Sequence, residues 1–444
     1  NGTIQVIVRL RPQLQRDKKN VYFEADSANG TVTAVPPTEE QSKQKSQTRK
    51  FFFDHVIEPN VQSLHIGKSD QERLYDLVGR PLLDHNFEGY NSCIFAYGQT
   101  GSGKSHTMTG SNHDEGLIPK TCQDLFYRIQ YLQKSDVLSH VYCSYFEIYN
   151  EQIRDLLSDG TKSALKVRES PAEGIHVKGL KEFHVESYSQ VKALLDQGNR
   201  ARVTAATNMN DTSSRSHAVL TLKLHQTRYI PETDETSETI SNIRMVDLAG
   251  SERATSTGTT GIRLREGGNI NKSLTTLGRV IVALSKNELK KNPNQRKELI
   301  PYRDSILTWV LKENLGGNSK TAMIACLSPT DYFEGMSTLR YADQAKRIRT
   351  RAIVNQGPLS SQEANKVIEE LQAQISILEK SMSTLKHSAE RNHSENSQNG
   401  EQTQKLEVLK SSLSFLELKI SIEENIKKSL RNENQHLKEH NQIL

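Results

Sequence analysis

The sequence lacks the features that define several classes of protein. Four cysteines, Cys93, Cys122, Cys143 and Cys326, are spread over 444 residues without a CxxC pair or metal-ligand spacing, which favours reduced thiols over disulfides or zinc. There is no apolar run near 18 residues and no signal peptide, so we expect no transmembrane segment and a cytosolic location. The 58 basic residues exceed the 53 acidic ones by only 5, too small a balance to indicate a nucleic-acid partner.

Composition divides the chain into two parts. The single tryptophan, Trp309, all prolines and nearly all aromatic residues lie before Ser360, and the remainder is rich in Glu, Lys, Ser, Asn, Gln and Leu. This split predicts a globular region followed by a helical one. Because the chain opens at Asn1 rather than at Met, we expect it to be part of a longer protein.

Before about residue 350, short β-rich runs alternate with helical patterns. The runs span 4–10, 92–97, 141–149, 218–225, 243–248 and 322–327. Several are apolar almost throughout, which is typical of strands buried on both faces of a sheet. The alternation predicts an α/β domain with a central, mostly parallel-type mixed sheet flanked by helices.

Beyond Pro358 the apolar period changes to three-four spacing. The pattern predicts a first coiled-coil segment over 359–386, a polar hinge over 387–405 and a second segment over 406–444. In the second segment, Glu423, Lys427 and two asparagines fall at seam positions, so we expect only a weak parallel homodimer. The alternative is a single amphipathic helix that folds back onto the globular region.

A phosphate-binding loop follows the run at 92–97. The residues that form the GQTGSGKS pattern are Gly98, Gln99, Thr100, Gly101, Ser102, Gly103, Lys104 and Ser105. Its glycines let backbone N–H groups converge on phosphates, Lys104 can reach the outer phosphates, and the Ser105 hydroxyl can bind Mg²⁺. The pattern predicts a nucleoside triphosphatase without saying of which kind.

Two later segments narrow the class. "NMNDTSSRSH" at 208–217 surrounds one arginine with hydroxyls, and "RMVDLAGSE" at 244–252 ends a buried strand with Asp247 and then a glycine. We expect Asp247 to hold Mg²⁺ directly or through water, and Gly250 to offer its N–H to the γ-phosphate. Each segment alone has an ordinary interpretation as a polar loop or a turn, but their order after the P-loop is specific.

These three segments resemble the P-loop, switch I and switch II of the kinesin superfamily, and "VRLRP" at 8–12, "NINKSL", "IPYRDS" and "STLRYADQAK" match further family motifs. The resemblance covers about residues 1–356 and is greatest to the kinesin-3 class. It implies a P-loop NTPase fold of the kinesin-motor type at 1–348, with ATP or ADP and Mg²⁺ as ligands. It further implies that Arg9, Arg11, Pro12 and His106 flank the adenine.

The same resemblance implies roles around the γ-phosphate. Ser105 and Ser214 contact Mg²⁺, and Arg215 pairs with Glu252 to close the two switches. An ion pair that forms only with the γ-phosphate present can order both switches around the attacking water. Ser213 and Glu252 are our candidates to relay the proton from that water.

A track-facing surface and a lever follow in the chain. Apolar residues at helical spacing predict a helix over 265–285, which the resemblance makes the relay helix on tubulin. The expected microtubule contacts are Asn271, Lys272, Arg279, Lys290, Lys291, Arg296, Lys297 and Arg303. Residues 349–358 resemble a neck linker, in which Ile353 and Val354 dock and Asn355 is the latch.

The sequence thus predicts a microtubule-stimulated ATPase that moves toward the plus end and carries cargo through adaptors bound by sequence beyond the chain's C-terminus. Two alternatives stay open. One is a non-motile microtubule-binding ATPase that regulates microtubule dynamics, against which the linker and heptads argue. The other is a P-loop small-molecule kinase, which would give no reason for the switch motifs.

Overall fold

The computed structural model describes residues 2–17, 20–38, 47–59, 68–111, 113–132, 137–158, 164–170, 174–206, 214–230, 235–252, 262–289 and 297–355. The chain divides into two compact units, residues 1–168 with 175–355 and residues 169–174 with 356–444. The fold and the site lie in the first unit. The predicted coiled-coil segments and hinge lie outside the described residues.

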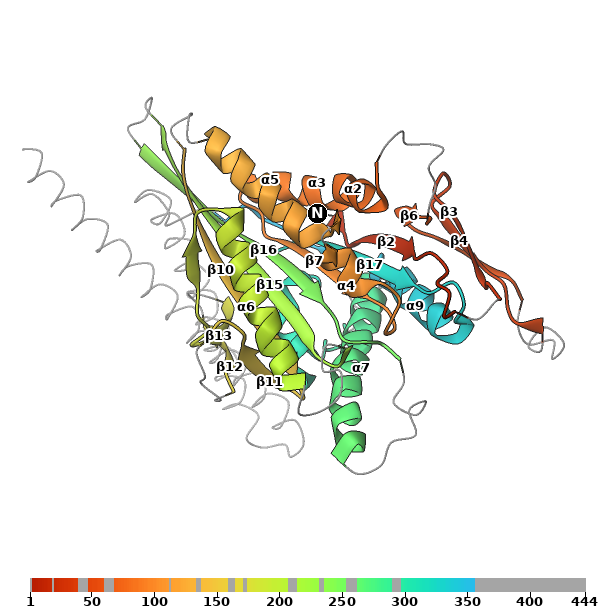
Figure 1. The fold of residues 1–444 in the computed structure, drawn as a ribbon. Helices are drawn as coiled ribbons and strands as arrows, with labels where there is room; N and C mark the ends of the chain where they lie inside the picture. The colour runs from red at the N-terminus through yellow and green to blue at the C-terminus, as the bar shows by residue number, and fades with distance from the viewer. Residues whose placement is uncertain are drawn as a thin grey trace, which may run out of the picture. The chain divides into compact units, whose positions relative to one another are not determined.

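A nine-stranded mixed sheet forms the centre of this unit (Figure 1). Its strand order is β11-β10-β15-β16-β7-β17-β2-β6, with β14 paired to β10 at the side. The strands are β2 (Gln5–Leu10), β6 (His55–Ile57), β7 (Ser92–Tyr97), β10 (Val137–Tyr149), β11 (Gln152–Asp155), β14 (Phe183–Val185), β15 (His217–Ile230), β16 (Glu235–Asp247) and β17 (Lys320–Leu327).

The sheet has a parallel half and an antiparallel half. Strand β7 lies between β16 and β17 and is parallel to both, and β2 continues the parallel order between β17 and β6. Strands β10, β15 and β16 form a long antiparallel ladder. Every residue of β7 is buried, as expected for a strand covered on both faces. The predicted mixed sheet flanked by helices is confirmed.

Helices cover both faces of the sheet. They are α2 (Asp70–Leu74), the π-turn η1 (Tyr75–Gly79), α3 (Arg80–Phe87), α4 (Lys104–Met108), α5 (Leu117–Leu132), α6 (Tyr188–Ala206), α7 (Ile262–Leu289), the 3₁₀ turns η5 (Tyr302–Asp304) and η6 (Lys312–Asn314), α8 (Ile306–Val310) and α9 (Tyr332–Ala345).

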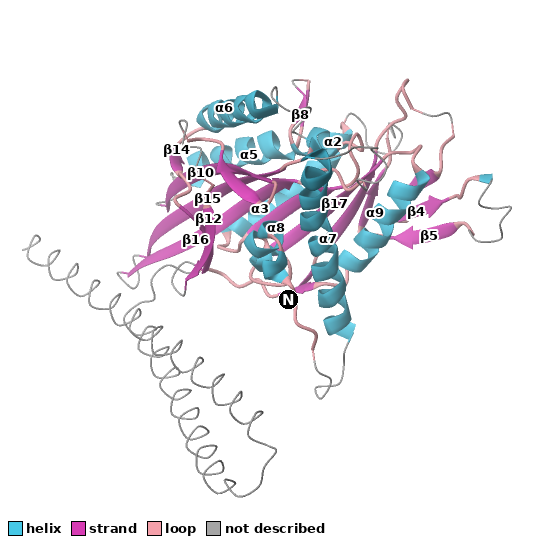
Figure 2. Cartoon of the chain, turned by 90° about the horizontal axis from the view of Figure 1, so that it is seen from below, coloured by secondary structure: helices cyan, strands magenta, loops and turns pink. Residues whose placement is uncertain are grey.

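Two hydrophobic cores separate these helices into two sets. One core packs α7, α8 and α9 against the sheet through residues such as Leu277, Leu307 and Leu339. The other packs α3 and α5 against the opposite face, with Leu83 and Leu125 fully buried. In Figure 2, α5 and α6 lie along the top of the unit and α7, α8 and α9 lie toward the viewer. None of the described helices is long and apolar enough to cross a membrane.

Four small sheets complete the fold. Strands β3 (Phe23–Asp26), β4 (Thr31–Ala34) and β5 (Arg49–Phe52) form one of them. Three two-stranded sheets pair β8 (Gly110–Ser111) with β9 (Asp114–Glu115), β12 (Lys166–Ser170) with β13 (Gly174–Lys178), and β1 (Gly2–Thr3) with β18 (Arg349–Thr350). The last pair joins the beginning of the chain to the start of the predicted neck linker, with Gly2 opposite Thr350.

All six β-rich runs of the sequence lie in strands, but four of these strands, β10, β15, β16 and β17, are longer than predicted. Strand β16 begins at Glu235 rather than near 243, and its ladder with β15 extends to the Ile230–Glu235 pair. The early part of β16 reads ETSETIS, which has no apolar alternation. Its strand structure therefore depends on pairing with β15 rather than on a local pattern.

Candidate functional site

The P-loop and the 247–252 segment meet because their strands are parallel neighbours. Strands β7 and β16 run side by side, with Ala96 opposite Asp247, so their carboxyl ends open at the same edge of the sheet. In open α/β sheets this edge is where ligands bind. Two backbone bonds hold the following turns together, since Leu248 N–H donates to Ala96 O at 3.4 Å and Ser251 N–H to Gly98 O at 3.1 Å.

The first P-loop glycine is required by a close backbone approach. Gly98 has φ +149°, and a Cβ placed on it would lie 2.4 Å from the carbonyl oxygen of Cys326 on β17. Any side chain would therefore push the loop away from the neighbouring strand. At the other end of the loop, Gly103 has φ +101° and precedes α4 directly, so the backbone turns sharply before Lys104.

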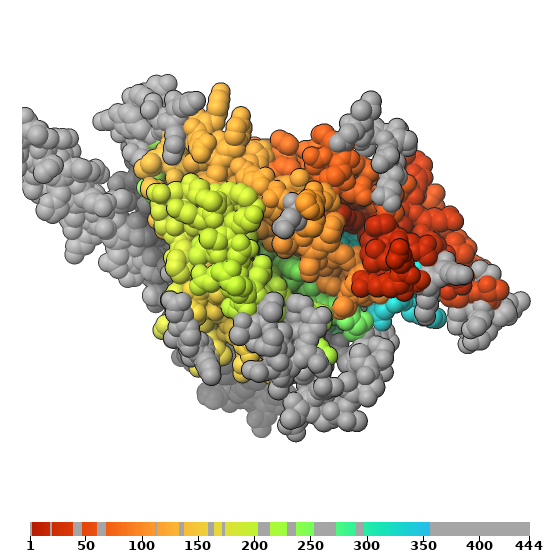
Figure 3. Space-filling model, viewed as in Figure 1, coloured from red at the N-terminus to blue at the C-terminus, as the bar shows by residue number. Residues whose placement is uncertain are grey.

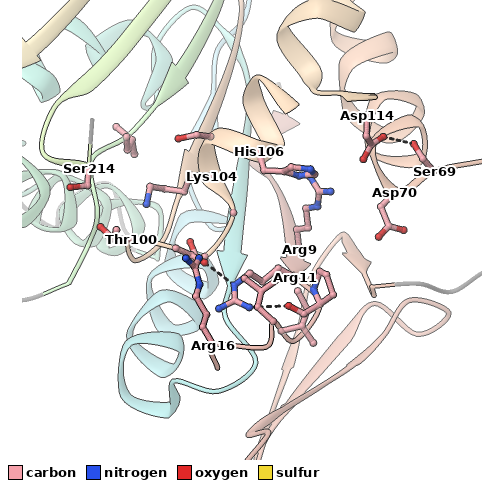
Figure 4. A pocket seen from close by; sticks show the side chains of 18 of the residues that line it. Arg9, Arg11, Arg16, Ser69, Asp70, Thr100, Lys104, His106, Asp114 and Ser214 are labelled. Atoms are coloured by element: carbon pink, nitrogen blue, oxygen red, sulfur yellow. Dashed lines mark hydrogen bonds between the residues drawn. The ribbon is translucent and has the colours of Figure 1, made fainter. Parts of the chain in front are cut away.

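Lys104 is buried at the base of this loop. Its Nζ donates to the carbonyl oxygens of Gly98 and Gln99, both at 2.9 Å, and its side chain points into the cavity that the loop borders (Figure 4). Burial lowers the pKa of its ammonium, an effect that the nearby Asp247 and Glu252 carboxylates oppose. A cation held in this way can neutralise phosphate oxygens placed above the loop.

Asp247 and Ser105 fit the expected magnesium site. Ser105 Oγ donates to Asp247 Oδ2 at 2.6 Å, while the buried Asp247 Oδ1 has no hydrogen-bond partner. Burial raises the pKa of Asp247, although Ser105 and Lys104 oppose the rise. A buried carboxylate with one unpaired oxygen beside a hydroxyl suits Mg²⁺, which takes one or two carboxylates and completes its shell with waters and phosphates. The described residues contain no cluster of three or more His, Cys, Asp or Glu that could hold a metal by themselves.

A backbone hydrogen bond connects the two switch segments. Gly250 N–H, which we expected to face the γ-phosphate, donates to Ser214 O at 2.9 Å. The Glu252 carboxylate accepts from Thr100 N–H at 2.8 Å and from Thr100 Oγ at 2.5 Å, which ties it to the P-loop. The roles of Gly250, Glu252 and Arg215 at the γ-phosphate stay predictions, and Ser213 lies outside the described residues.

A cavity of about 700 Å³ adjoins these groups. Lys104 and Ser214 lie at one end, Ser69, Asp70 and Asp114 at the other, and Arg9 and His106 between them (Figure 4). In the space-filling view, the N-terminal segment in red and the P-loop region in orange are adjacent on one surface (Figure 3). The lining includes all four residues that the sequence assigned to the adenine, namely Arg9, Arg11, Pro12 and His106.

Arg9 and Arg11 are held by partners of their own. Buried Arg9 donates from Nη1 to Gln71 Oε1 at 2.7 Å and to Thr107 Oγ1 at 3.0 Å, and burial lowers its pKa. Arg11 donates to Gly101 O at 2.7 Å and forms an ion pair with Asp17, which lowers the Asp17 pKa to about 2. Gln71 and Thr107 were not predicted as site residues, because neither belongs to a recognised motif.

Basic groups expected at the track are exposed around α7. The side chains of Lys272 and Arg279 are 52% and 56% exposed and form ion pairs with Glu151 and Asp304. Arg303 lies over the Trp309 ring at 5.4 Å, and Lys297 is exposed. Asn271 belongs to α7 by its backbone, and Lys290, Lys291 and Arg296 lie outside the described residues.

The predicted neck linker lies against the edge of the domain as far as Asn355. Asn355 N–H donates to Gly89 O at 2.9 Å and Ile240 N–H donates to Asn355 O at 3.1 Å, while Val354 forms a bridge with Tyr90. Ile353 is 64% exposed and contacts the domain through its backbone N–H, which donates to Asn318.

Asn318 holds the linker and was not predicted. Its Oδ1 accepts from Ile353 N–H at 2.8 Å, and its Nδ2 donates to Asn355 Oδ1 at 2.8 Å. Asn318 stands in a Gly-Gly-Asn-Ser turn between η6 and β17. A short polar turn of this kind gives no local signal that it will meet a segment 35 residues later.

Comparisons with known proteins agree on one family. A family model described as the kinesin motor domain matches residues 9–348. Similar relatives include the kinesin-like proteins KIF1A of Rattus norvegicus, 48% identical over 389 residues, and unc-104 of Caenorhabditis elegans, 47% identical over 384. These matches cover 85% and 84% of this chain but only 22% and 23% of the relatives' own length, so the chain spans less than a quarter of either relative.

Solved structures show the same likeness. A KIF14 dimer with AMP-PNP in complex with a microtubule matches with a TM-score of 0.70 and 45% identity, covering 80% of this chain and 96% of that one. A fast kinesin matches with a TM-score of 0.68 and 36% identity, covering 80% and 94%.

Proposed function

Because the chain belongs to the kinesin motor family, and is most similar to its kinesin-3 members, we propose that it is an ATP-driven microtubule motor. The observation that carries the proposal is the meeting of Lys104, Ser105 and Asp247 with both switch segments at one edge of the sheet. The proposed location is the cytoplasm, on microtubules.

The proposed chemistry is transfer of the γ-phosphoryl group of ATP to water. Bound Mg²⁺ would supply charge neutralisation at the β- and γ-phosphates, held through Ser105, Ser214 and Asp247. Lys104 binds phosphate oxygens and the P-loop fixes their position, so that the protein contributes mainly orientation and electrostatic stabilisation. Arg215 and Glu252 close around the attacking water, and Glu252 with Ser213 relays its proton.

The proposed path from the nucleotide to the track begins at the 247–252 segment, which leads toward α7. Lys272 and Arg279 on this helix are exposed, with Arg303 nearby in η5, and the sequence 286–298 carries five basic and two acidic residues. Exposed positive charge attracts an acidic partner at long range. A microtubule surface rich in carboxylates fits this face.

Motion is proposed to come from docking of the neck linker. Release and rebinding of residues 349–358 would move whatever follows them. Because the motor precedes its linker, the family order implies movement toward the plus end. A weak parallel homodimer through 359–444 and cargo adaptors bound beyond the chain's C-terminus complete the proposal as transport.

Substitution Asn318→Ala is expected to weaken linker docking. It removes two hydrogen bonds to the linker, worth together about 2 kcal/mol, which is roughly a 30-fold shift in the docking equilibrium. A spin label on a cysteine placed at the exposed position 353 reports docking through its mobility, because the four native cysteines are buried. Asn29→Ala, whose amide bonds Asp26 far from the linker, is the control. Equal label mobility in Asn318→Ala and in the control would contradict the proposal that Asn318 holds the docked linker.

The proposal predicts that ATP turnover rises strongly when microtubules are added. Track binding should reorganise the switches through α7, and a coupling free energy of about 1–3 kcal/mol corresponds to about 5- to 150-fold stimulation. Steady-state phosphate release with and without polymerised tubulin, at several salt concentrations, measures it. Turnover that does not respond to microtubules at any salt concentration would contradict the proposed motor function.

A further inference from the structure

His217 connects three elements of the domain at a single buried point. It is the first residue of β15 and lies one position before Ala218, which pairs with Asp247 at the end of β16. Its Nδ1 accepts a hydrogen bond from Ala249 N–H at 3.0 Å. On its other side, Nε2 lies 2.8 Å from Ser273 Oγ on α7. The imidazole therefore bridges the strand that follows switch I, the backbone of switch II and the helix expected on the track.

The hydrogen bonds fix the protonation state of this ring. Since Nδ1 accepts from a backbone N–H, it carries the lone pair, so the single proton of the neutral imidazole is on Nε2 and is donated to Ser273. Burial, with the nearby charges of Lys104 and Arg202, lowers the His217 pKa to about 3. The ring stays neutral at all physiological pH values, and the direction of both bonds is constant.

An ordinary core histidine would need only to satisfy its two nitrogens. His217 does so with groups from two different segments, which in the proposed function respond to the nucleotide and to the track. Ala249 is the residue before Gly250, whose N–H bonds Ser214 O, and Ser273 is buried on α7 next to the exposed Lys272. A change in the Ala249–Gly250 backbone therefore cannot occur without moving the ring or breaking one of its two bonds.

We propose that His217 is a positioning residue that couples the switch II backbone to α7 through the Ala249–His217–Ser273 hydrogen-bond chain. A rigid ring with one donor and one acceptor transmits displacement between the two segments, as a contiguous packed network does. The inference rests on the proposed function in one respect, namely that the nucleotide moves α7. It adds a specific route that does not pass through the predicted Arg215–Glu252 pair.

Two variants break the hydrogen bond between His217 and Ser273, one from each side. His217→Asn places an amide oxygen near the position of Nδ1, so it keeps an acceptor for Ala249 N–H but cannot reach Ser273. Ser273→Ala removes the same link from the other side and leaves the imidazole in place. Ser285→Ala removes another buried hydroxyl of α7, 12 residues along the helix, and is the matched control.

Hydrogen exchange of the whole chain, measured by mass spectrometry, reports on the switch II segment and on α7 separately. Wild type is measured with MgADP and with a non-hydrolysable MgATP analogue, and the ratio of exchange rates between the two states is taken for peptides near 243–252 and 272–285. In His217→Asn and Ser273→Ala we expect the nucleotide-dependent ratio at 272–285 to fall at least about fivefold. The ratio at 243–252 should persist in both, and Ser285→Ala should match wild type. The double variant should lose no more than either single variant.

An unchanged ratio at 272–285 in Ser273→Ala would overturn the inference, and so would a wild type in which that ratio does not depend on the nucleotide. Loss of the ratio in Ser285→Ala as well would also overturn it, since any buried hydroxyl of α7 would then serve. These measurements contain no microtubules. Failure of the coupling route is thus distinguished from failure of the proposed motor function, which microtubule-stimulated turnover decides.

Discussion

Lys104→Ala is expected to abolish nucleotide turnover. The lysine ammonium is the cation that the P-loop holds at its base, 2.9 Å from the Gly98 and Gln99 carbonyl oxygens. Its loss removes the positive charge that would neutralise the outer phosphates, where a single preorganised donor is worth about 10²–10³ in rate. Because Lys104 also contributes to binding, we expect affinity for MgATP to fall together with turnover.

Titration with a fluorescent ATP analogue and steady-state phosphate release measure the two effects. Lys68→Ala is the matched control, because this lysine also lines the cavity but bonds Asp76 instead of the loop. We expect Lys68→Ala to retain most of its turnover. Full stimulated activity in Lys104→Ala would refute the assignment of the nucleotide site.

Gly250→Ala is expected to let nucleotide bind but to stop hydrolysis. A Cβ at this position would lie 2.2 Å from Thr100 Oγ1 and 2.3 Å from one Glu252 carboxylate oxygen. These are the two groups whose hydrogen bonds tie switch II to the P-loop, so the methyl group must break that contact. We expect a loss of turnover of about 10²-fold or more, with MgATP affinity changed far less.

Single-turnover kinetics separate binding from hydrolysis in this variant. Gly278→Ala on α7 is the control, because a Cβ there meets only Tyr341 Cε2 at an ordinary 3.4 Å and alanine favours the helix. Normal hydrolysis in Gly250→Ala would show that the Gly250–Thr100–Glu252 arrangement has no part in the reaction. If Gly250→Ala lost MgATP binding instead of hydrolysis, the assignment of Gly250 to switch II would be contradicted.

The sequence could predict the local structure around the candidate site. The P-loop is one continuous segment between a strand and a helix, so its pattern specifies its own geometry, and strand β7 has the predicted bounds. Asp247 could be placed at the end of its strand for the same reason. Neighbouring carboxyl ends in a parallel sheet then bring the segments together, which is a general rule of the fold class.

Contacts between distant segments were not predictable in this way. Gln71 and Thr107 hold Arg9 across 62 and 98 residues, and Asn318 meets Ile353 and Asn355 through a turn with no pattern of its own. Their partners are set by how α2 and α4 pack against the sheet and by where the turn before β17 lies, which no single window of sequence encodes. The same holds for His217, whose motif was evident but whose partner on α7 was not.

In the proposed function, ATP hydrolysis at this site drives directed movement on microtubules. The most direct test attaches the whole chain to a glass surface through its C-terminus and records the gliding of polarity-marked microtubules with MgATP, so that dimerisation is not required. The proposed function predicts gliding with the minus end leading, as plus-end-directed motors produce, and none with Lys104→Ala. Microtubules that bind to the wild-type surface but do not glide in MgATP would contradict it.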